Sequence, residues 1–140
     1  MKLELEQVDS IVVVHPQGDF DNEGVREVQD GLAEHLAKDD PKIIVDLSGT
    51  SRVTSAALRL FVSLSKQLDS RGGGFALCGP KNDVARALLV GGLERVCKVV
   101  PDLNEALEWL RIDDRLDRLA RLVVDLLARA DDRRRLAEAG

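Results

Sequence analysis

The first third of the chain alternates between strand and helix patterns of hydrophobic and polar residues. Apolar and acidic side chains alternate over residues 3–6, which predicts a half-exposed strand, and the apolar run at 11–14 predicts a second one. The polar residues at 17–21 are expected to carry the chain out of that strand. Apolar side chains then recur at helical spacing, at Val25, Val28, Leu32 and Leu36. Asp21 or Asn22 can cap this helix, because a short polar side chain accepts a hydrogen bond from a free backbone N–H.

The segment from 43 to 58 predicts a strand, a loop and the start of a helix. The apolar run at 43–45 ends at Asp46, and a small polar loop is expected at 48–52. A helical stripe follows, formed by Leu58, Phe61, Leu64 and Leu68. The hydroxyls of Thr54 and Ser55 lie where this helix begins, and the free N–H groups there accommodate either a capping oxygen or a phosphate. Ser55 is therefore either a structural cap or a switch.

The rest of the core sequence repeats the same alternation. Three glycines at 72–74 are interpreted as a helix stop, since an apolar strand at 75–78 follows where a P-loop would need a lysine and a helix. Asn82 or Asp83 is expected to cap a short helix that ends at Gly91 and Gly92. A last strand is predicted at 96–100. Asp102 with Glu105 resembles a capping box, and the predicted helix that it opens runs to residue 110.

The predicted order of elements is ββαβαβαβα. Strands that alternate with helices imply an α/β fold with a mixed, mainly parallel sheet of four or five strands, joined by right-handed crossovers and covered by helices. At 140 residues the chain is expected to hold one such domain, over residues 1–110, followed by a helical extension at 111–140.

Composition and charge exclude several functions. A net charge of −5 argues against nucleic-acid binding, which depends on a basic surface. The sequence has no signal-peptide pattern and no apolar run near the ~18 residues that span a bilayer, so we expect a cytoplasmic protein that is not embedded in a membrane. Cys78 and Cys97 lack metal-site or redox spacing and are interpreted as core residues. His15 and His35 have no cysteine or carboxylate at ligand spacing, so no metal site or cofactor is predicted.

The local sequence does not assemble an enzyme. A nucleophilic serine needs a general base within hydrogen-bond reach, and the neighbours of Ser55 offer no histidine, lysine or catalytic carboxylate. The protein is therefore predicted not to be a catalyst.

Several segments together carry a family resemblance. They are QGDFD after the second strand, the strand IIVDLSG, the segment VTSAALRLF, the glycine-rich break before FALCGP, and VARALLVGGLERVCKVVPDLNEAL. In this order they resemble the STAS domain of bacterial anti-sigma factor antagonists, over about residues 3 to 110.

The resemblance implies both a function and a site. In that family a partner that is both kinase and anti-sigma factor phosphorylates a serine in the motif aspartate-serine-serine/threonine-glycine-leucine. Ser55 matches that serine and Leu58 the leucine, with Thr54 as a second candidate for the phosphate. The resemblance also matches Asp21, Asp46 and the pair Gly92-Leu93 to family positions. The partner-binding face is then expected to comprise Asp21, Thr54, Ser55, Ala56, Leu58 and Arg59.

Two functions follow from this resemblance. In the first, the protein binds an anti-sigma factor kinase through the face around Ser55, releases the sigma factor, and loses that binding when phosphorylated. Thr54, Ala56 and Ala57 depart from the motif, however, and these departures fit a second function. There the protein is a non-phosphorylated STAS scaffold or small subunit of a larger complex, either a stress-sensing assembly or a lipid-transport ATPase.

The last thirty residues lie beyond the resemblance. Ile112, Leu116, Leu119, Val123, Leu126 and Ala130 repeat with the alternating four- and three-residue spacing of a heptad seam. A helix is predicted from about 113 to 130. Its apolar surface is expected either to fold back on the domain or to pair with another chain, which would make a homodimer through residues 112–130 or a docking element.

Overall fold

The fold is a mixed sheet with helices on both faces. The computed structural model describes residues 1–112, 123 and 126–127, and Met1–Leu110 form one compact unit within it. The elements are β1 (Lys2–Val8), β2 (Ile11–Phe20), α1 (Asn22–Leu36), β3 (Lys42–Asp46), β4 (Thr50–Val53), α2 (Ser55–Ser70), β5 (Gly74–Cys78), α3 (Asn82–Val90), the 3₁₀ helix η1 (Leu93–Arg95), β6 (Lys98–Val100) and α4 (Leu103–Ile112).

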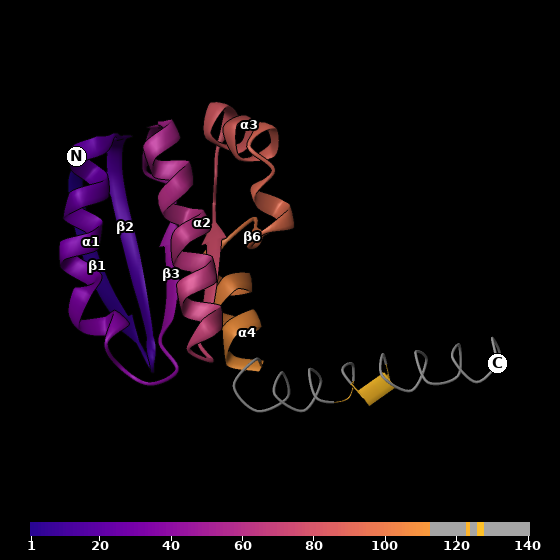
Figure 1. The fold of residues 1–140 in the computed structure, drawn as a ribbon. Helices are drawn as coiled ribbons and strands as arrows, with labels where there is room; N and C mark the ends of the chain where they lie inside the picture. Colours follow the sequence, from indigo (N-terminus) through magenta and orange to yellow (C-terminus); the bar gives the residue numbers. More distant parts are fainter. Residues whose placement is uncertain (113–122, 124–125, 128–140) are drawn as a thin grey trace, which may run out of the picture. The chain divides into compact units, whose positions relative to one another are not determined.

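The sheet runs in the order β1-β2-β3-β5-β6, and β4 pairs with β2 off this path. The β1 strand is antiparallel to β2, and the other pairs are parallel. The arrangement is shown in Figure 1, with α1 and α2 in front of the sheet. The predicted α/β class and the order of the predicted elements are confirmed.

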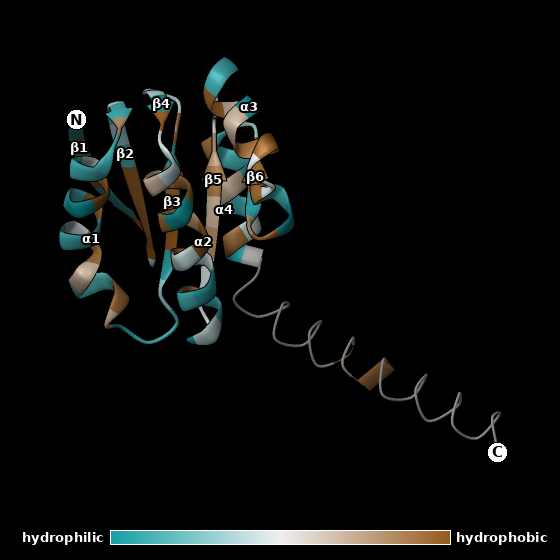
Figure 2. Ribbon diagram, turned by 45° about the horizontal axis from the view of Figure 1, so that its top comes forward, coloured by the Kyte–Doolittle hydropathy of each residue, from teal (hydrophilic) through white to brown (hydrophobic). Residues whose placement is uncertain are grey.

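Two cores hold the layers together, one on each face of the sheet. Alternate residues of β2 divide between them: Val12 and Val14 pack with α1 and α2, whereas Ile11 and Val13 pack with α4. The central strands are therefore apolar on both faces, as Figure 2 shows for β2, β3 and β5. The β1 strand keeps its acidic residues exposed, which agrees with the alternation predicted for it.

The sheet has one more strand than the upper limit of the prediction, because β4 forms where a loop was expected. Gly18 pairs with Thr50 and Phe20 with Val53, and a register shift falls between Gly18 and Asp19. The same pairing extends β2 through the polar residues that were expected to leave the sheet. Each polar stretch acquires a hydrogen-bonding partner far away in the sequence, which local patterns do not reveal.

The helix starts were predicted with mixed success. Asp21 caps α1, since its Oδ1 accepts from Gly24 N–H at 3.0 Å, and Asp102 accepts from Glu105 N–H at 2.9 Å at the start of α4. The predicted cap of α3 was wrong. Lys81 occupies the capping position without a side-chain hydrogen bond, and Asn82 is already the first helical residue.

The triple glycine ends α2, as predicted. Gly72 has a left-handed backbone, with φ of 74°, and the Gly73 N–H donates to Leu68 O at 2.9 Å. A Cβ atom built on Gly73 would overlap the Pro41 carbonyl group, so no other residue fits there without a backbone shift.

Both cysteines are buried and free, as predicted. Burial raises the pKa of the Cys78 thiol to about 12, with a further contribution from the Asp46 carboxylate. Burial likewise raises the pKa of Cys97 to about 11. Thiols of this kind stay protonated at neutral pH and are poor nucleophiles.

His15 does have carboxylate neighbours, contrary to the expectation from spacing. Its Nδ1 lies 3.0 Å from Asp46 Oδ2 and its Nε2 lies 2.9 Å from Glu6 Oε2, so the ring connects β1 to β3. Both carboxylates lie on strands next to β2 in the sheet. They are 9 and 31 residues from His15 in the sequence, so local spacing did not reveal them. Within residues 1–112, 123 and 126–127 no cluster of His, Cys, Asp and Glu is arranged to hold a metal ion.

Two sequence expectations concern the termini and membranes. Residues 123 and 126–127 are helical and exposed, and the rest of the predicted helix at 113–130 lies outside the described residues, as does the homodimer predicted through residues 112–130. Among the residues that the structure does describe, no helix combines the length and apolar character needed to cross a bilayer.

Gly73→Ala should lower the free energy of unfolding by about 3 kcal/mol, because the new methyl group overlaps backbone and cannot be accommodated by a side-chain rotation. Urea unfolding would measure the loss. Gly24→Ala in helix α1 is the matched control, since a Cβ there would crowd only the flexible end of the Met1 side chain and would make an ordinary 3.4 Å contact with Phe20. A Gly73→Ala variant as stable as the Gly24→Ala variant would contradict the close approach.

Cys78 should make the protein less stable in alkali. The folded thiol has a pKa of about 12, raised by burial, so above the ordinary pKa of 9.0 the unfolded thiol ionises while the folded one keeps its proton. Stability from this group is complete below pH 9.0 and falls as the pH rises towards 12. In unfolding experiments across that range, Cys78→Ala should show a shallower decline than wild type; parallel declines would refute the assignment.

Candidate functional site

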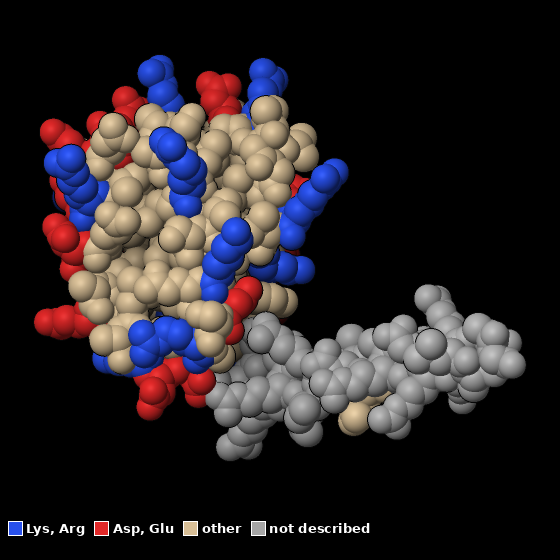
Figure 3. Space-filling model, in the orientation of Figure 1, with Lys and Arg blue, Asp and Glu red and all other residues tan. Residues whose placement is uncertain are grey.

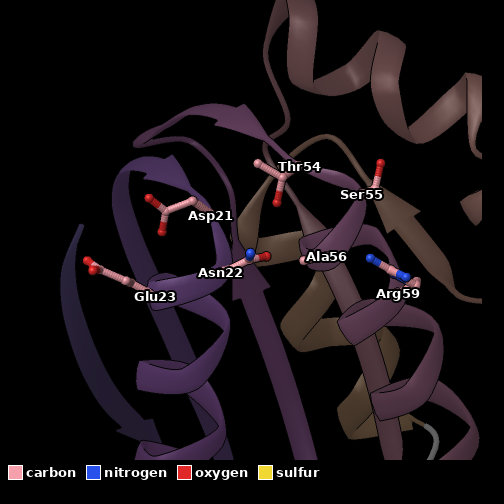
Figure 4. Close-up of a pocket in the computed structure, with 7 residues that line it drawn as sticks. All are labelled: Asp21, Asn22, Glu23, Thr54, Ser55, Ala56 and Arg59. Atoms are coloured by element: carbon pink, nitrogen blue, oxygen red, sulfur yellow. The ribbon is translucent and has the colours of Figure 1, made fainter.

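The pairing of β2 with β4 brings the starts of two helices together. Phe20, the last residue of β2, pairs with Val53 at the end of β4. The next residues along each chain segment, Asp21 and Thr54, are the caps of α1 and α2. Figure 4 shows these two helix starts side by side, with their side chains around a shared hollow.

Thr54 holds the start of α2 in place. Its N–H and its Oγ1 both donate to the Phe20 carbonyl oxygen, at 3.1 and 3.0 Å. The same Oγ1 accepts from Ala57 N–H at 3.4 Å, which is the capping hydrogen bond of α2. Of the two hydroxyls predicted at the helix start, the structural cap is therefore Thr54 and not Ser55.

Ser55 is the first residue of α2 and is exposed. Its hydroxyl makes no hydrogen bond to any described residue, because Thr54 already satisfies the cap. In Figure 4 the hydroxyl points upward from the start of α2, away from the side chains of Glu23 and Arg59. Ser55 is thus accessible to a partner and contributes no hydrogen bond to the fold.

The shared hollow has a volume of about 560 Å³. It is lined by Asp21, Asn22, Glu23, Thr54, Ser55, Ala56 and Arg59. The carboxylates come from the α1 side and the guanidinium of Arg59 from the α2 side, so the two walls have opposite charge. Arg59 has no ion pair with another described residue, and its charge is available to a partner.

A second hollow, of about 400 Å³, opens on the other side of Ser55. Its lining residues are mostly apolar: Ser55, Leu58, Arg59, Val62, Gly91 and Leu93. Ser55 and Arg59 therefore border both hollows, one polar and one apolar.

The linings of the two hollows show which side chains are available for chemistry there. Neither hollow has a histidine, cysteine or lysine in its lining. A serine hydroxyl without a hydrogen-bonded base is a weak nucleophile, but it can accept a phosphoryl group from an enzyme that supplies its own base. The start of α2 also offers backbone N–H groups to an anion.

The structure gathers the six residues expected to bind a partner. Five of them, Asp21, Thr54, Ser55, Ala56 and Arg59, line the polar hollow, and Leu58 lines the apolar one with Ser55 and Arg59. The sequence did not assign Val62, Gly91 or Leu93 to this surface, although the resemblance matched Leu93 to a family position; α2 and the segment at 91–93 meet only in the folded chain. Asn22 and Glu23 could have been found from their adjacency to Asp21.

The chain matches a known protein family along most of its length. The STAS domain family model covers residues 2–106. A protein of Thermotoga maritima named "Putative anti-sigma factor antagonist" is 31% identical over 105 residues, which cover 74% of this chain and 93% of that protein.

Solved structures give the same result for the fold. A crystal structure of a Thermotoga maritima protein named "putative anti-sigma factor antagonist" matches with a TM-score of 0.72 and 30% identity, over 78% of this chain and 94% of that one. SpoIIAA in its unphosphorylated form matches with a TM-score of 0.67 and 20% identity, over 79% and 96% of the two chains. The phosphorylated Bacillus SpoIIAA and a stressosome chain match with TM-scores of 0.61 and 0.62, at 19% and 24% identity.

Thr54→Val should lower the free energy of unfolding by about 1–2 kcal/mol, since it removes the cap of α2 and the hydroxyl bond to Phe20. Ser55→Ala should change it by less than about 0.5 kcal/mol, because that hydroxyl has no partner in the described structure. Thermal unfolding of both variants would measure the difference. A larger loss for Ser55→Ala than for Thr54→Val would show that the cap is wrongly assigned.

Proposed function

Because the chain belongs to the STAS domain family, we propose that it is an anti-sigma factor antagonist that binds an anti-sigma factor kinase through the surface around Ser55. The proposal is supported by the position, the exposure and the hydrogen bonding of Ser55. It is exposed at the first turn of α2, borders both hollows, and has a hydroxyl that the fold does not use. Such a protein acts on the transcription machinery, which places it in the cytoplasm.

The protein is then a substrate of its partner and has no catalytic activity of its own. The kinase supplies the ATP and the base, and this chain supplies an accessible hydroxyl. Thr54 borders the same hollow, but its hydroxyl is engaged with Phe20 O and Ala57 N–H. Phosphorylation of Thr54 would break both contacts, and for this reason Ser55 is the better acceptor.

Phosphorylation of Ser55 would weaken the binding of the partner and leave the fold of this chain intact. A phosphate adds about −1.5 to −2 charges at neutral pH. At Ser55 it would lie beside the N–H groups of the α2 start and within one helical turn of Arg59, and both tolerate an anion. The added charge and volume would therefore change mainly the surface that the partner contacts.

A second candidate function is a STAS subunit that is never phosphorylated, within a stress-sensing assembly or on a lipid-transport ATPase. Its support is the altered motif, in which Thr54 replaces an aspartate and serves as a cap instead. The match to a stressosome chain is compatible with this role. Co-purification separates the two: a small ATP-binding kinase supports the first function, and membrane or multi-subunit machinery supports the second.

The switch can be tested on the partner recovered by co-purification. Ser55→Ala should bind it as wild type does, whereas protein carrying phosphoserine at position 55 should bind at least about tenfold more weakly, because charge and volume are added at the contact surface. Calorimetry or surface plasmon resonance would measure both affinities.

A matched control is Ser51→Glu, a new carboxylate at an exposed serine of β4 that borders neither hollow. It should leave binding unchanged, whereas Ser55→Glu should weaken it. Equal affinities for wild type, Ser55→Ala and the phosphoserine protein would eliminate the switch and favour the second function.

A further inference from the structure

Two large apolar residues are strongly exposed at the end of α3. Leu89 is 65% exposed and Val90 is 82% exposed, whereas Val84 and Leu88 of the same helix are buried. The helix therefore presents apolar residues on its outer side as well as on its core side. Contiguous exposed apolar surface is a common feature of interaction sites, so the neighbourhood of these two residues is a candidate.

These residues lead into the apolar hollow beside Ser55, because Gly91 follows Val90 directly and lines that hollow. A Cβ atom on Gly91 would lie 3.4 Å from Leu58 Cδ1 and 3.1 Å from Leu93 Cδ2. The absence of a side chain at Gly91 thus keeps the space between α2 and η1 open. We call this space, whose lining residues are given above, the α2–η1 groove; Leu89 and Val90 directly precede its lining residue Gly91 in the chain.

The groove has a basic border on an acidic protein. Residues 1–110 contain 12 basic and 18 acidic side chains. On α2, however, Arg59 lines the groove, and Lys66 lies on the same helical strip, one turn beyond Val62. Arg95 and Glu94 are exposed in η1, and Asp69, about one turn beyond Lys66 on α2, is near enough to add to the effect of burial in raising the pKa of Cys97, so the border carries three cations and two anions.

The neighbouring helix has the opposite charge. The α1 helix contains Glu23, Glu27, Asp30 and Glu34 with a single Arg26. Figure 3 shows the acidic side chains mainly along the α1 edge and basic side chains over α2. A partner with acidic side chains is attracted to the groove and repelled by α1. The two charged surfaces together therefore favour one orientation of the partner.

We propose that the α2–η1 groove binds an amphipathic helix of a partner protein, with apolar residues on one face and acidic residues beside them. Helices that dock in grooves use apolar anchors at helical spacing, and the acidic flanks match Arg59, Lys66 and Arg95. The inference rests on the proposed function in one respect: the partner that docks in the groove is the protein whose binding is controlled by phosphorylation of Ser55. A phosphate on Ser55, which lines the groove, would repel such a helix.

The experiment uses the full chain and a fluorescent synthetic peptide, with leucines at helical spacing on one face and glutamates beside them. Its counterpart carries lysine in place of each glutamate. The glutamate peptide should bind, and the NMR amide shifts should change at Leu58, Val62, Gly91 and Leu93. Val90→Asp and Arg59→Glu should each weaken binding at least about tenfold.

Leu5→Asp is the matched control, since Leu5 is an exposed apolar residue of β1, 44% accessible and away from the groove. It should leave binding unchanged. Preference for the lysine peptide, or shift changes confined to other surfaces, would overturn the proposal.

Two other occupants would also overturn it. Concentration-dependent shifts of the groove amides without peptide would identify a second copy of this chain, and shifts of those amides in Leu119→Asp would identify its own C-terminal segment. The peptide assay needs neither a kinase nor a phosphate. Its failure therefore leaves the proposed switch at Ser55 standing, and absence of phosphorylation leaves the groove result standing.

Discussion

The candidate site depends on the carbonyl oxygen of Phe20. This one acceptor receives both the N–H and the hydroxyl of Thr54, which ties the end of β2 to the start of α2. The Phe20 ring is fully buried and meets Phe61 of α2 edge-to-face, with 5.4 Å between ring centroids. Backbone and side chain therefore join the same two elements, and an edge-to-face aromatic pair adds about 0.5–1.5 kcal/mol to simple burial. Asp21, the next residue, starts α1 beside it.

This arrangement separates the hydroxyl that caps α2 from the exposed hydroxyl of Ser55, the proposed phosphate acceptor. Thr54 takes the cap, so Ser55 can be modified without loss of a hydrogen bond that the fold needs. In a family member with an aspartate at the position of Thr54, a carboxylate would lie next to the serine. In this chain the neighbour is a neutral threonine, and its hydroxyl is hydrogen-bonded to Phe20 O and Ala57 N–H. The local charge comes instead from Asp21 and Glu23 on one wall and Arg59 on the other. Electrostatic selection of a partner at this surface therefore depends on residues of two different helices.

Local patterns predicted most of the fold because most of its elements have strong periodicity. Continuous apolar runs gave β3 and β5, helical spacing gave α1 and α2, and Asp21 and Asp102 were recognised as caps. The β4 strand was missed because Thr50–Val53 is short and mostly polar and is stabilised by pairing with β2. The carboxylate contacts of His15 and the α2–η1 groove were out of reach for the same reason: residues distant in sequence meet only in the folded chain. The residues of the Ser55 surface were predictable through the family motif, whereas the division of roles between Thr54 and Ser55 required coordinates.

The proposed function requires that the partner acts on Ser55 and on no other hydroxyl. The most direct measurement is site-resolved mass spectrometry of the full chain after incubation with ATP and the kinase that co-purifies with it. The account predicts a single phosphate on Ser55, and none on Ser55→Ala protein incubated in the same way. A phosphate on Thr54 or another residue, or an unmodified Ser55 in a complex that contains an active kinase, would contradict it.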